Sequence, residues 1–333
     1  MPAANSATAP SSNTPTATAA ASQGSSATAI SKSKIITFIG GGNMAEAILG
    51  GLIAQGYLPE NLRVSDPIAE RCVYMHTKYR VPVYTDNPAA LCGQPGASPA
   101  GCASSYPTDG RSSDIIILAV KPQVTQLVLA PLGAELTQTQ PLLISIVAGI
   151  RIADLLRWIK PAVPQNTPAN LPPVVRCMPN TPALVGQGAS GLFADSRVSE
   201  TQRAMTCEIL GAVSKVFWVD QENLIDAVTA VSGSGPAYFF LMLEAMQQGG
   251  LAAGLSSQMA AELAAQTCLG AATMILNSSD SAAELRRKVT SPKGTTEAAI
   301  NTMIAGGLKE AVVGGVMAAD RRSKELADIL GQQ

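Results

Sequence analysis

A glycine-rich turn near the amino end restricts the fold of this chain more than any other feature. The turn, Gly40-Gly41-Gly42-Asn43-Met44-Ala45, follows the apolar run 35–39 and precedes apolar residues at helical spacing. This order matches the pattern G-x-G-x-x-A between a strand and a helix. Gly40 permits a tight turn, Gly42 lets backbone N–H groups approach a pyrophosphate, and Ala45 lets the helix pack closely on the strand. The turn therefore predicts a dinucleotide-binding domain of the Rossmann type, with phosphates at the helix N-terminus.

An acidic residue lies where such a domain holds the adenosine ribose. Asp66 comes about 20 residues after Ala45, which is the usual spacing for that contact. A glycine turn alone is weak evidence, because similar turns are common. The flanking strand and helix, together with Asp66, make the dinucleotide interpretation the favoured one.

Strand-like apolar runs alternate with helical patterns through the first two thirds of the chain. Such alternation predicts a mostly parallel sheet flanked by helices, an α/β domain. Two stretches rich in Pro, Gly, Ser and Ala, near 93–113 and 161–173, are expected to be loop insertions. The predicted strands are 35–39, 62–65, 81–84, 114–120, 142–147, 174–178 and 216–219.

The composition changes after residue 220 to helical segments rich in Ala, Met, Leu and Gly, which predict an all-α second domain. The helix 257–276 is apolar or small over most of its circumference, so an intertwined dimer interface is expected, with burial inside one large subunit as the alternative. The predicted domains are a disordered tail 1–33, a dinucleotide-binding domain 34–220 and a helical dimerisation and substrate domain 221–333. The predicted helices are 222–231, 236–253, 257–276, 281–289, 295–305 and 309–330.

Composition argues against several other classes of protein. The net charge is −1 with 14% charged residues, so no nucleic-acid partner is expected. No purely apolar run approaches the roughly 20 residues of a membrane span, so we expect a soluble protein without a membrane partner. The tail lacks the apolar core of a signal peptide; a cytoplasmic location is favoured, and a plastid transit peptide stays open.

The cysteines and the histidine do not predict a metal site. The six cysteines have no C-x-x-C spacing and His76 is the single histidine, so no metal ligand set is expected. Cys177 is a conceivable nucleophile, but it lies in an apolar strand-like run. Core packing is the favoured interpretation of Cys177.

A second candidate site lies about 250 residues after the glycine turn. The segment Val289-Thr290-Ser291-Pro292-Lys293-Gly294-Thr295-Thr296 is typical of a helix N-terminus, whose free N–H groups can bind a carboxylate. A threonine hydroxyl there can bond a neighbouring nitrogen or oxygen. An ordinary capped helix start is the alternative.

Five sequence blocks together resemble one enzyme family. They occur in matching order between about residues 34 and 330, and the last two are the most specific. The chain resembles the pyrroline-5-carboxylate reductases, which reduce a cyclic imine to proline in the last step of proline synthesis. The blocks are the glycine turn, Ala119-Val120-Lys121-Pro122, Arg176-Cys177-Met178-Pro179-Asn180-Thr181-Pro182, Ser232-Gly233-Ser234-Gly235-Pro236-Ala237-Tyr238 and Ser291-Pro292-Lys293-Gly294-Thr295-Thr296.

The resemblance implies a role for each matching residue. Ser291, Gly294, Thr295 and Thr296 are expected to hold the substrate, with the Thr296 hydroxyl at the ring nitrogen as the catalytic group. NADPH is the implied cofactor, with NADH as the alternative, and dimers are expected to assemble into larger rings. The implied cofactor-binding residues are Gly40, Gly42, Asn43, Met44, Ser65, Asp66, Asn87, Ala119, Lys121, Pro122, Ala148, Met178 and Asn180.

Two positions depart from the family pattern. The family often has Gly-Gly where this chain has Lys293-Gly294, so Lys293 either adds charge for the carboxylate or points to solvent. Asp66 occupies the place that a 2′-phosphate would approach, and its charge repels that group. Arg71 and Arg63 are the candidate cations that could compensate for Asp66.

The expected reaction is hydride transfer from nicotinamide C4 to the imine carbon. A protonated imine is already an electrophile, so positioning by Thr296 can suffice without a strong general base. One alternative is a β-hydroxyacid dehydrogenase, but its general acid/base lysine is missing from 236–249. The other is a non-catalytic dinucleotide-sensing protein, which would not need the Thr296 hydroxyl.

Overall fold

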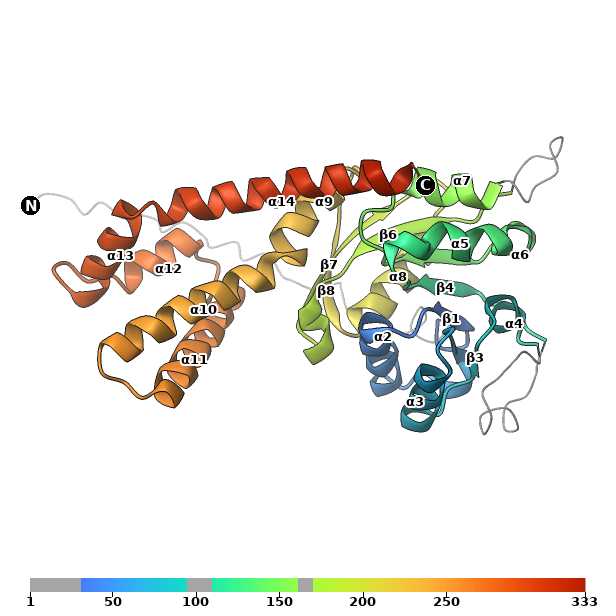
Figure 1. The fold of residues 1–333 in the computed structure, drawn as a ribbon, viewed down its shortest axis with the longest axis horizontal. Helices are drawn as coiled ribbons and strands as arrows, with labels where there is room; N and C mark the ends of the chain where they lie inside the picture. Colours follow the sequence, from blue (N-terminus) through green and yellow to red (C-terminus); the bar gives the residue numbers. More distant parts are fainter. Residues whose placement is uncertain (1–30, 95–109, 161–169, 333) are drawn as a thin grey trace, which may run out of the picture.

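The computed structural model describes residues 31–94, 110–160 and 170–332. It has two lobes, a sheet domain and a helical domain, joined through helices at residues 224–233 and along the last helix (Figure 1). The predicted tail up to residue 30 and most of the two predicted loop insertions lie outside the described residues. The boundaries of the predicted domains therefore stay a prediction.

The first lobe is built on one sheet of eight strands in the order β3-β2-β1-β4-β5-β6-β7-β8. All neighbouring strands are parallel except β6 and β7, which are antiparallel. The chain reverses its winding between β1 and β4, which is where open α/β sheets bind ligands. The strands are β1 (Ile36–Ile39), β2 (Leu62–Ser65), β3 (Val83–Tyr84), β4 (Ile115–Leu118), β5 (Leu142–Ser145), β6 (Val174–Met178), β7 (Gly188–Ala194) and β8 (Ser214–Trp218).

The predicted mostly parallel α/β sheet is confirmed, with one strand more than expected. All seven predicted strands are present, and their ends shift by at most two residues. The additional strand is β7, whose sequence GASGLFA is rich in residues with low strand propensity. It pairs with β6 in antiparallel register and with β8 in parallel register, and its backbone hydrogen bonds rather than its composition define it.

Helices cover both faces of the sheet and bury two apolar cores. One core joins the inner faces of α2 (Asn43–Ala54), α3 (Ala69–Tyr79) and α8 (Glu200–Gly211) to the strands. The other joins α5 (Thr125–Leu129), α6 (Gly133–Thr139) and α7 (Ile152–Ile159) to the opposite face. Burial on both faces explains why the strands are almost continuously apolar. The short helices of this lobe are α4 (Asn87–Cys92), η1 (Pro59–Asn61), η2 (Pro122–Val124), η3 (Ala130–Leu132) and η5 (Thr181–Val185).

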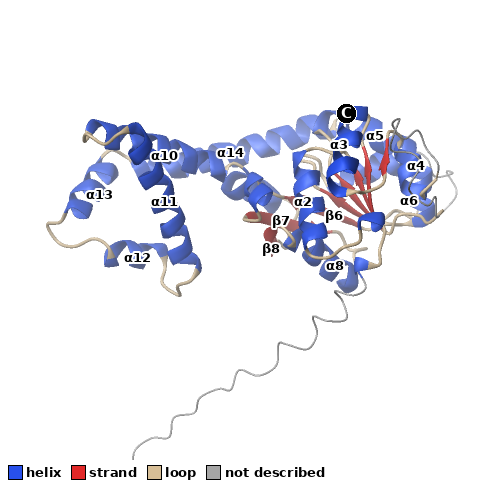
Figure 2. Ribbon diagram, turned by 90° about the horizontal axis from the view of Figure 1, so that it is seen from below, coloured by secondary structure: helices blue, strands red, loops and turns tan. Residues whose placement is uncertain are grey.

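The second lobe is helical, as predicted. Figure 2 shows α10 to α13 gathered at one end of the molecule, away from the strands. The last helix runs back to the sheet domain, where Ser323 donates to Asp226 at 2.7 Å and Arg151 pairs with Asp328 at 2.7 Å. The helices are α9 (Leu224–Val228), the π-helix η6 (Thr229–Gly233), α10 (Gly235–Ala252), α11 (Ser257–Leu276), α12 (Ala282–Lys288), α13 (Thr295–Ala305) and α14 (Leu308–Gly331).

The helical lobe exposes much of its apolar surface in a single chain. Within α11 only Ala260 and Ala264 are buried, so the alternative that this helix is buried inside one subunit is wrong. By length and composition alone, two segments, Leu224–Ala252 and Ser257–Leu276, could cross a membrane, and a bent third candidate joins α13 and α14. This differs from the sequence-based expectation, because many small residues make these helices apolar on average without a pure apolar run.

Candidate active site

The predicted cofactor residues gather at the carboxyl ends of the parallel strands. Gly40 follows β1 with a φ of +96°, a left-handed conformation that glycine adopts readily. A Cβ on Gly40 would lie 2.6 Å from the carbonyl oxygen of Ala119, which follows β4. The Gly40 N–H donates to the Ser65 carbonyl at 2.8 Å. The turn therefore fits between the ends of β2 and β4 only because residue 40 has no side chain.

Gly42 stands at the start of α2 and faces open space. No atom lies within 4 Å of a Cβ built on Gly42, and no side chain caps the helix. Asn43 is exposed and Met44 is partly buried beside it. The first-turn N–H groups of α2 are thus accessible to a ligand, and the residues fit the phosphates of a dinucleotide.

The predicted ribose contacts lie at the end of β2. Asp66 accepts hydrogen bonds from the Gly41 N–H at 2.8 Å and the Ile68 N–H at 2.9 Å. Ser65 donates to the Asn87 side-chain oxygen at 2.6 Å. These contacts join the residues predicted for the ribose into one group next to the glycine turn.

Arg63 does not compensate the charge of Asp66. Its side chain is 2% exposed and donates to the carbonyls of Ala90 at 3.1 Å and Arg111 at 2.9 Å. Because its side chain is buried and bonded to carbonyls, Arg63 is not available to compensate for the charge of Asp66. Arg71 is the one that lies at the glycine turn, since it donates to the Gly41 carbonyl.

The remaining predicted cofactor residues lie at or beyond the ends of β4, β5 and β6. Lys121 is exposed immediately before Pro122, which opens η2, and Ala148 is exposed beyond β5. Met178 ends β6 and lies against the second lobe, since a Cβ on Gly233 would be 2.7 Å from its terminal methyl.

Asn180 holds this edge of the site together. Its amide nitrogen donates to the Ser232 carbonyl at 3.1 Å, and its oxygen accepts from the Ala189 N–H at 2.8 Å. Both ends of the amide are therefore used to join β7 to the serine-glycine block of the second lobe.

The predicted substrate segment joins α12 to α13. Gly294 is the N-cap residue of α13 and no side chain caps that helix, whereas serines cap α8, α11 and α12. The first-turn N–H groups of Thr295 and Thr296 are therefore accessible to an anion, unlike those of an ordinary capped start. Lys293 is exposed, adopts a φ of +61°, and donates its N–H to Glu297 at 2.7 Å.

The two halves of the predicted site are apart within one chain. Figure 1 shows α2 in the sheet domain and α13 at the far end of the helical domain. The chain thus brings the cofactor residues together and the substrate residues together, but not the two groups to each other.

Cys177 has the structural role that its apolar surroundings predict. The side chain is buried in the core of the sheet domain. Burial raises the pKa of the Cys177 thiol to about 12. A thiol with that pKa is not a nucleophile at neutral pH.

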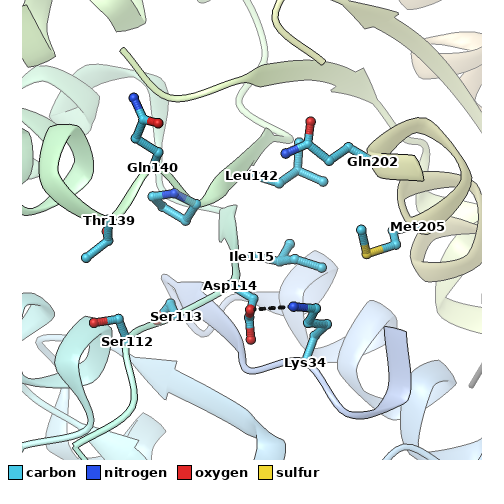
Figure 3. A pocket seen from close by; sticks show the side chains of 11 residues that line it. Lys34, Ser112, Ser113, Asp114, Ile115, Thr139, Gln140, Leu142, Gln202 and Met205 are labelled. Atoms are coloured by element: carbon cyan, nitrogen blue, oxygen red, sulfur yellow. Dashed lines mark hydrogen bonds and ion pairs between the residues drawn. The ribbon is translucent and has the colours of Figure 1, made fainter. Parts of the chain in front are cut away.

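A polar pocket and an apolar groove lie outside this site. A polar pocket of about 320 Å³ opens at the amino ends of β4 and β5, where Lys34 and Asp114 form an ion pair at 2.8 Å (Figure 3). An apolar groove of about 780 Å³ runs between α10, α11 and α12 and includes Phe239, Met246 and Ile275. None of the predicted site residues lines either one.

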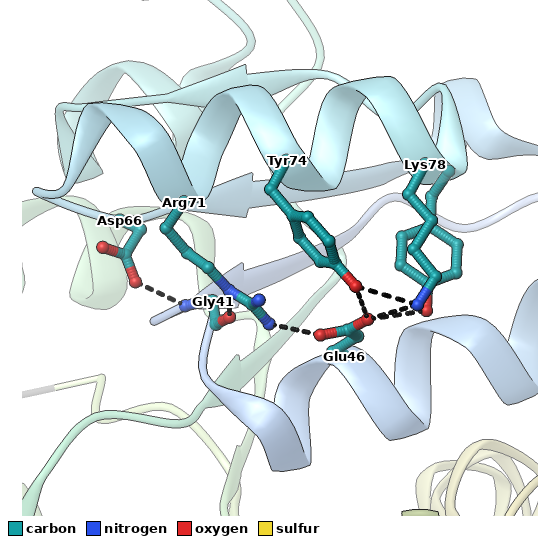
Figure 4. Close-up of polar contacts among 7 residues, drawn as sticks. Gly41, Glu46, Asp66, Arg71, Tyr74 and Lys78 are labelled. Atoms are coloured by element: carbon teal, nitrogen blue, oxygen red, sulfur yellow. Dashed lines mark hydrogen bonds and ion pairs between the residues drawn. The ribbon is translucent and has the colours of Figure 1, made fainter.

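Sequence reasoning missed one polar cluster beside the glycine turn. Glu46 of α2 contacts four side chains of α3 (Figure 4). The spacing of Arg71, Tyr74 and Lys78, which places them on one face of a helix, was the available signal. Nothing local indicates that this face meets α2.

The sheet domain with its glycine turn, joined to an apolar helical domain, defines a two-domain NAD(P)-dependent oxidoreductase. The model of the pyrroline-5-carboxylate reductase dimerisation domain matches residues 222–326, and that of NADP oxidoreductases described as coenzyme F420-dependent matches residues 35–149. A pyrroline-5-carboxylate reductase of Pseudomonas aeruginosa is 45% identical over 297 residues, which cover 89% of this chain and 98% of that protein. The chain belongs to the pyrroline-5-carboxylate reductase family.

Solved structures agree with this assignment. A pyrroline-5-carboxylate reductase from Coxiella burnetii matches with a TM-score of 0.76 and 38% identity, over 88% of this chain and 98% of that one. The Plasmodium falciparum pyrroline carboxylate reductase, solved with NADP bound, matches with a TM-score of 0.70 and 26% identity, over 89% and 99%. A nicotinamide cofactor and self-association through the helical domain follow from this family.

Proposed function

We propose that this protein reduces 1-pyrroline-5-carboxylate to L-proline with a reduced nicotinamide dinucleotide. The observation that carries the proposal is the family match over both lobes, with 45% identity across 98% of a relative named for this reaction. The missing lysine in 236–249 weighs against hydroxyacid oxidation. The start of α13, which no side chain caps, supports a second ligand site, which a protein that only senses a dinucleotide would not need.

The sheet domain would hold the cofactor. The open approach to Gly42 and the crowded position of Gly40 support phosphates at the start of α2. Ser65, Asp66 and Asn87 would then lie at the adenosine ribose, and Met178 on the nicotinamide side. A bound reduced nicotinamide supplies the hydride that the imine carbon receives.

The start of α13 would hold the substrate. The N–H groups of Thr295 and Thr296 would bind its carboxylate, helped by the positive end of the helix and by the compact turn at Ser291 and Gly294. The Thr296 hydroxyl would hydrogen-bond the ring nitrogen and fix the face that the ring presents. Positioning of this kind can lower a barrier by several kcal/mol, on the order of a well-oriented intramolecular reaction.

A second copy of the chain would complete the site. The separation of α2 and α13 in Figure 1 and the match to a dimerisation domain both support this arrangement. The apolar groove between α10, α11 and α12 offers a surface for the partner copy. A partner that covers this surface would also account for the exposed helices without a membrane, and dimers would assemble into a larger ring.

NADPH is the proposed physiological cofactor, and NADH is the alternative. The bound NADP in the Plasmodium relative supports NADPH, while the carboxylate of Asp66 favours NADH. We place the protein in the cytoplasm and propose no nucleic-acid partner. Fractionation of cells that produce the full chain, with a tagged amino-truncated form as control, tests the location.

A direct assay tests the proposed activity. Purified protein is mixed with 1-pyrroline-5-carboxylate and either NADPH or NADH, and nicotinamide absorbance is followed beside a Thr296→Ala variant. Turnover that falls by tenfold or more in the variant, as expected for a lost charge-assisted contact, supports the proposal. Oxidation of a 3-hydroxy acid with no imine reduction would replace it with the dehydrogenase alternative.

A further inference from the structure

Glu46 is the centre of a cluster between α2 and α3. One carboxylate oxygen pairs with Arg71 at 2.6 Å. The other accepts from Lys78 at 2.7 Å, Tyr74 at 2.8 Å and Tyr79 at 3.0 Å. We call these five residues the Glu46 cluster. Figure 4 shows Arg71, Tyr74 and Lys78 of α3 directed at the Glu46 carboxylate.

Arg71 connects this cluster to the glycine turn. Its Nε donates to the Gly41 carbonyl while its Nη2 contacts Glu46. The Gly41 N–H in turn donates to Asp66. The guanidinium also stacks on the Tyr74 ring, 4.8 Å from its centroid. Arg71 therefore lies between the expected ribose position and Glu46.

A 2′-phosphate on the adenosine ribose would lie near two negatively charged carboxylates. Asp66 is a negative group at the end of β2, and Glu46 is a second one in the first turn of α2. Arg63 is buried and committed to carbonyls. Of the two candidate arginines, Arg71 is thus the one placed to neutralise a phosphate. Glu46 competes with the phosphate for the Arg71 guanidinium.

The remaining members of the cluster let Glu46 release Arg71. With Arg71 removed, Glu46 still accepts from one ammonium and two hydroxyl groups. A carboxylate with three donors is well satisfied, so moving the guanidinium to a phosphate does not leave a bare charge behind. Without Lys78, Arg71 would be the only full positive charge on Glu46.

We propose that the Glu46 cluster determines the preference between dinucleotides with and without a 2′-phosphate. Arg71 binds the phosphate, Glu46 competes for Arg71, and Lys78 weakens that competition. The proposal rests on the proposed function only in assigning the glycine turn to a dinucleotide. It concerns binding, so turnover is not needed to test it.

Calorimetric titration of the full-length protein with adenosine 2′,5′-bisphosphate and with adenosine 5′-monophosphate tests the proposal. The affinity for the bisphosphate divided by the affinity for the monophosphate isolates the contribution of the 2′-phosphate. Damage to the glycine turn would weaken the binding of both ligands alike and leave this ratio unchanged. Arg71→Met should lower the ratio by roughly tenfold or more, the loss of one charge-assisted contact. Glu46→Gln should raise it by about threefold, and Lys78→Met should lower it by about threefold.

Two further variants serve as controls. Lys78→Arg keeps the charge and should restore the wild-type ratio, while Lys215→Met removes an exposed lysine from β8 and should leave it unchanged. A ratio that is the same in wild type, Arg71→Met and Glu46→Gln overturns the proposal while leaving the dinucleotide site intact. If wild-type protein binds neither nucleotide, both this proposal and the proposed function fail.

Discussion

The guanidinium of Arg176 lies 3.3 Å from the carboxylate of Glu222, and this ion pair joins the two lobes. Arg176 belongs to β6 and is 2% exposed, while Glu222 precedes α9. Asp226 lies 3.9 Å from the same guanidinium and accepts from Ser323 of α14. The start of the helical segment 224–233 and the last helix, α14, are therefore both connected to the sheet domain around the buried Arg176.

Replacing this arginine should destabilise the protein strongly. In Arg176→Ala the carboxylates of Glu222 and Asp226 lose their cation inside the structure, which we expect to cost roughly 3–5 kcal/mol of unfolding free energy. Arg322→Ala is the control, because its pair with Glu325 is exposed and should contribute less than about 1 kcal/mol. Urea denaturation measures both, and equal losses would contradict the structural role of Arg176.

The two outer glycines of the turn should respond differently to alanine. Gly40→Ala introduces a Cβ 2.6 Å from a carbonyl oxygen at a φ of +96°, and we expect a loss of stability of about 1–3 kcal/mol. Gly42→Ala meets no protein atom, so stability should hold while the affinity for a dinucleotide falls. Denaturation and nucleotide titration separate these effects. If Gly42→Ala bound the dinucleotide with wild-type affinity, the phosphates would not bind at this turn.

Two inactive variants should complement each other if the site is shared between subunits. In Thr296→Ala the substrate half is damaged, and in Gly42→Asp the cofactor half is damaged. Co-expressed chains that pair at random should regain about a quarter of wild-type activity, because half of the dimers carry one intact site of two. Activity of the co-expressed mixture that stays at the level of either variant alone would place both halves within one chain.

The stability of the protein should depend on Glu46 in acid. Burial raises the pKa of Glu46, but hydrogen bonds from Lys78, Arg71, Tyr74 and Tyr79 outweigh it and lower the pKa to about 2. A lowered pKa in the folded state contributes stability that is present above the ordinary value of 4.5 and lost as the pH falls toward 2. When the pH is lowered from about 5 to about 2, the unfolding temperature should therefore fall more steeply in wild type than in Glu46→Gln. Parallel declines would mean that the carboxylate is not held as described.

Lys293 should contribute little to substrate binding through its charge. Its side chain is exposed, and its backbone N–H rather than its ammonium bonds Glu297. Lys293→Gly should therefore change the KM for 1-pyrroline-5-carboxylate by less than about twofold, well under the tenfold of one strong contact. A tenfold rise in KM would instead assign the ammonium to the substrate carboxylate.

The sequence predicted the parts of this fold that depend on local pattern. Strand β2, strand β6 and helices α11 and α13 begin and end where expected, since apolar periodicity and helix-start residues define them locally. Strand β7 could not be predicted, because its glycines and alanines have low strand propensity and its pairing with β6 and β8 is a tertiary effect.

The candidate site was predictable only in its two halves. The glycine turn and the start of α13 each have a local signature, and Gly40 lies next to Ser65 and Ala119 as parallel strands require. The separation of the halves follows from how the lobes are joined, which no local pattern records. The Glu46 cluster likewise depends on packing between α2 and α3.

The most direct test of this account measures proline formed for each nicotinamide oxidised. Purified wild-type protein is incubated with 1-pyrroline-5-carboxylate and NADPH, proline is quantified by chromatography, and Thr296→Ala is run beside it. We expect equal amounts of proline and oxidised cofactor in wild type, with both falling together in the variant. Oxidation of NADPH without proline, or no reaction with either NADPH or NADH, would contradict the account.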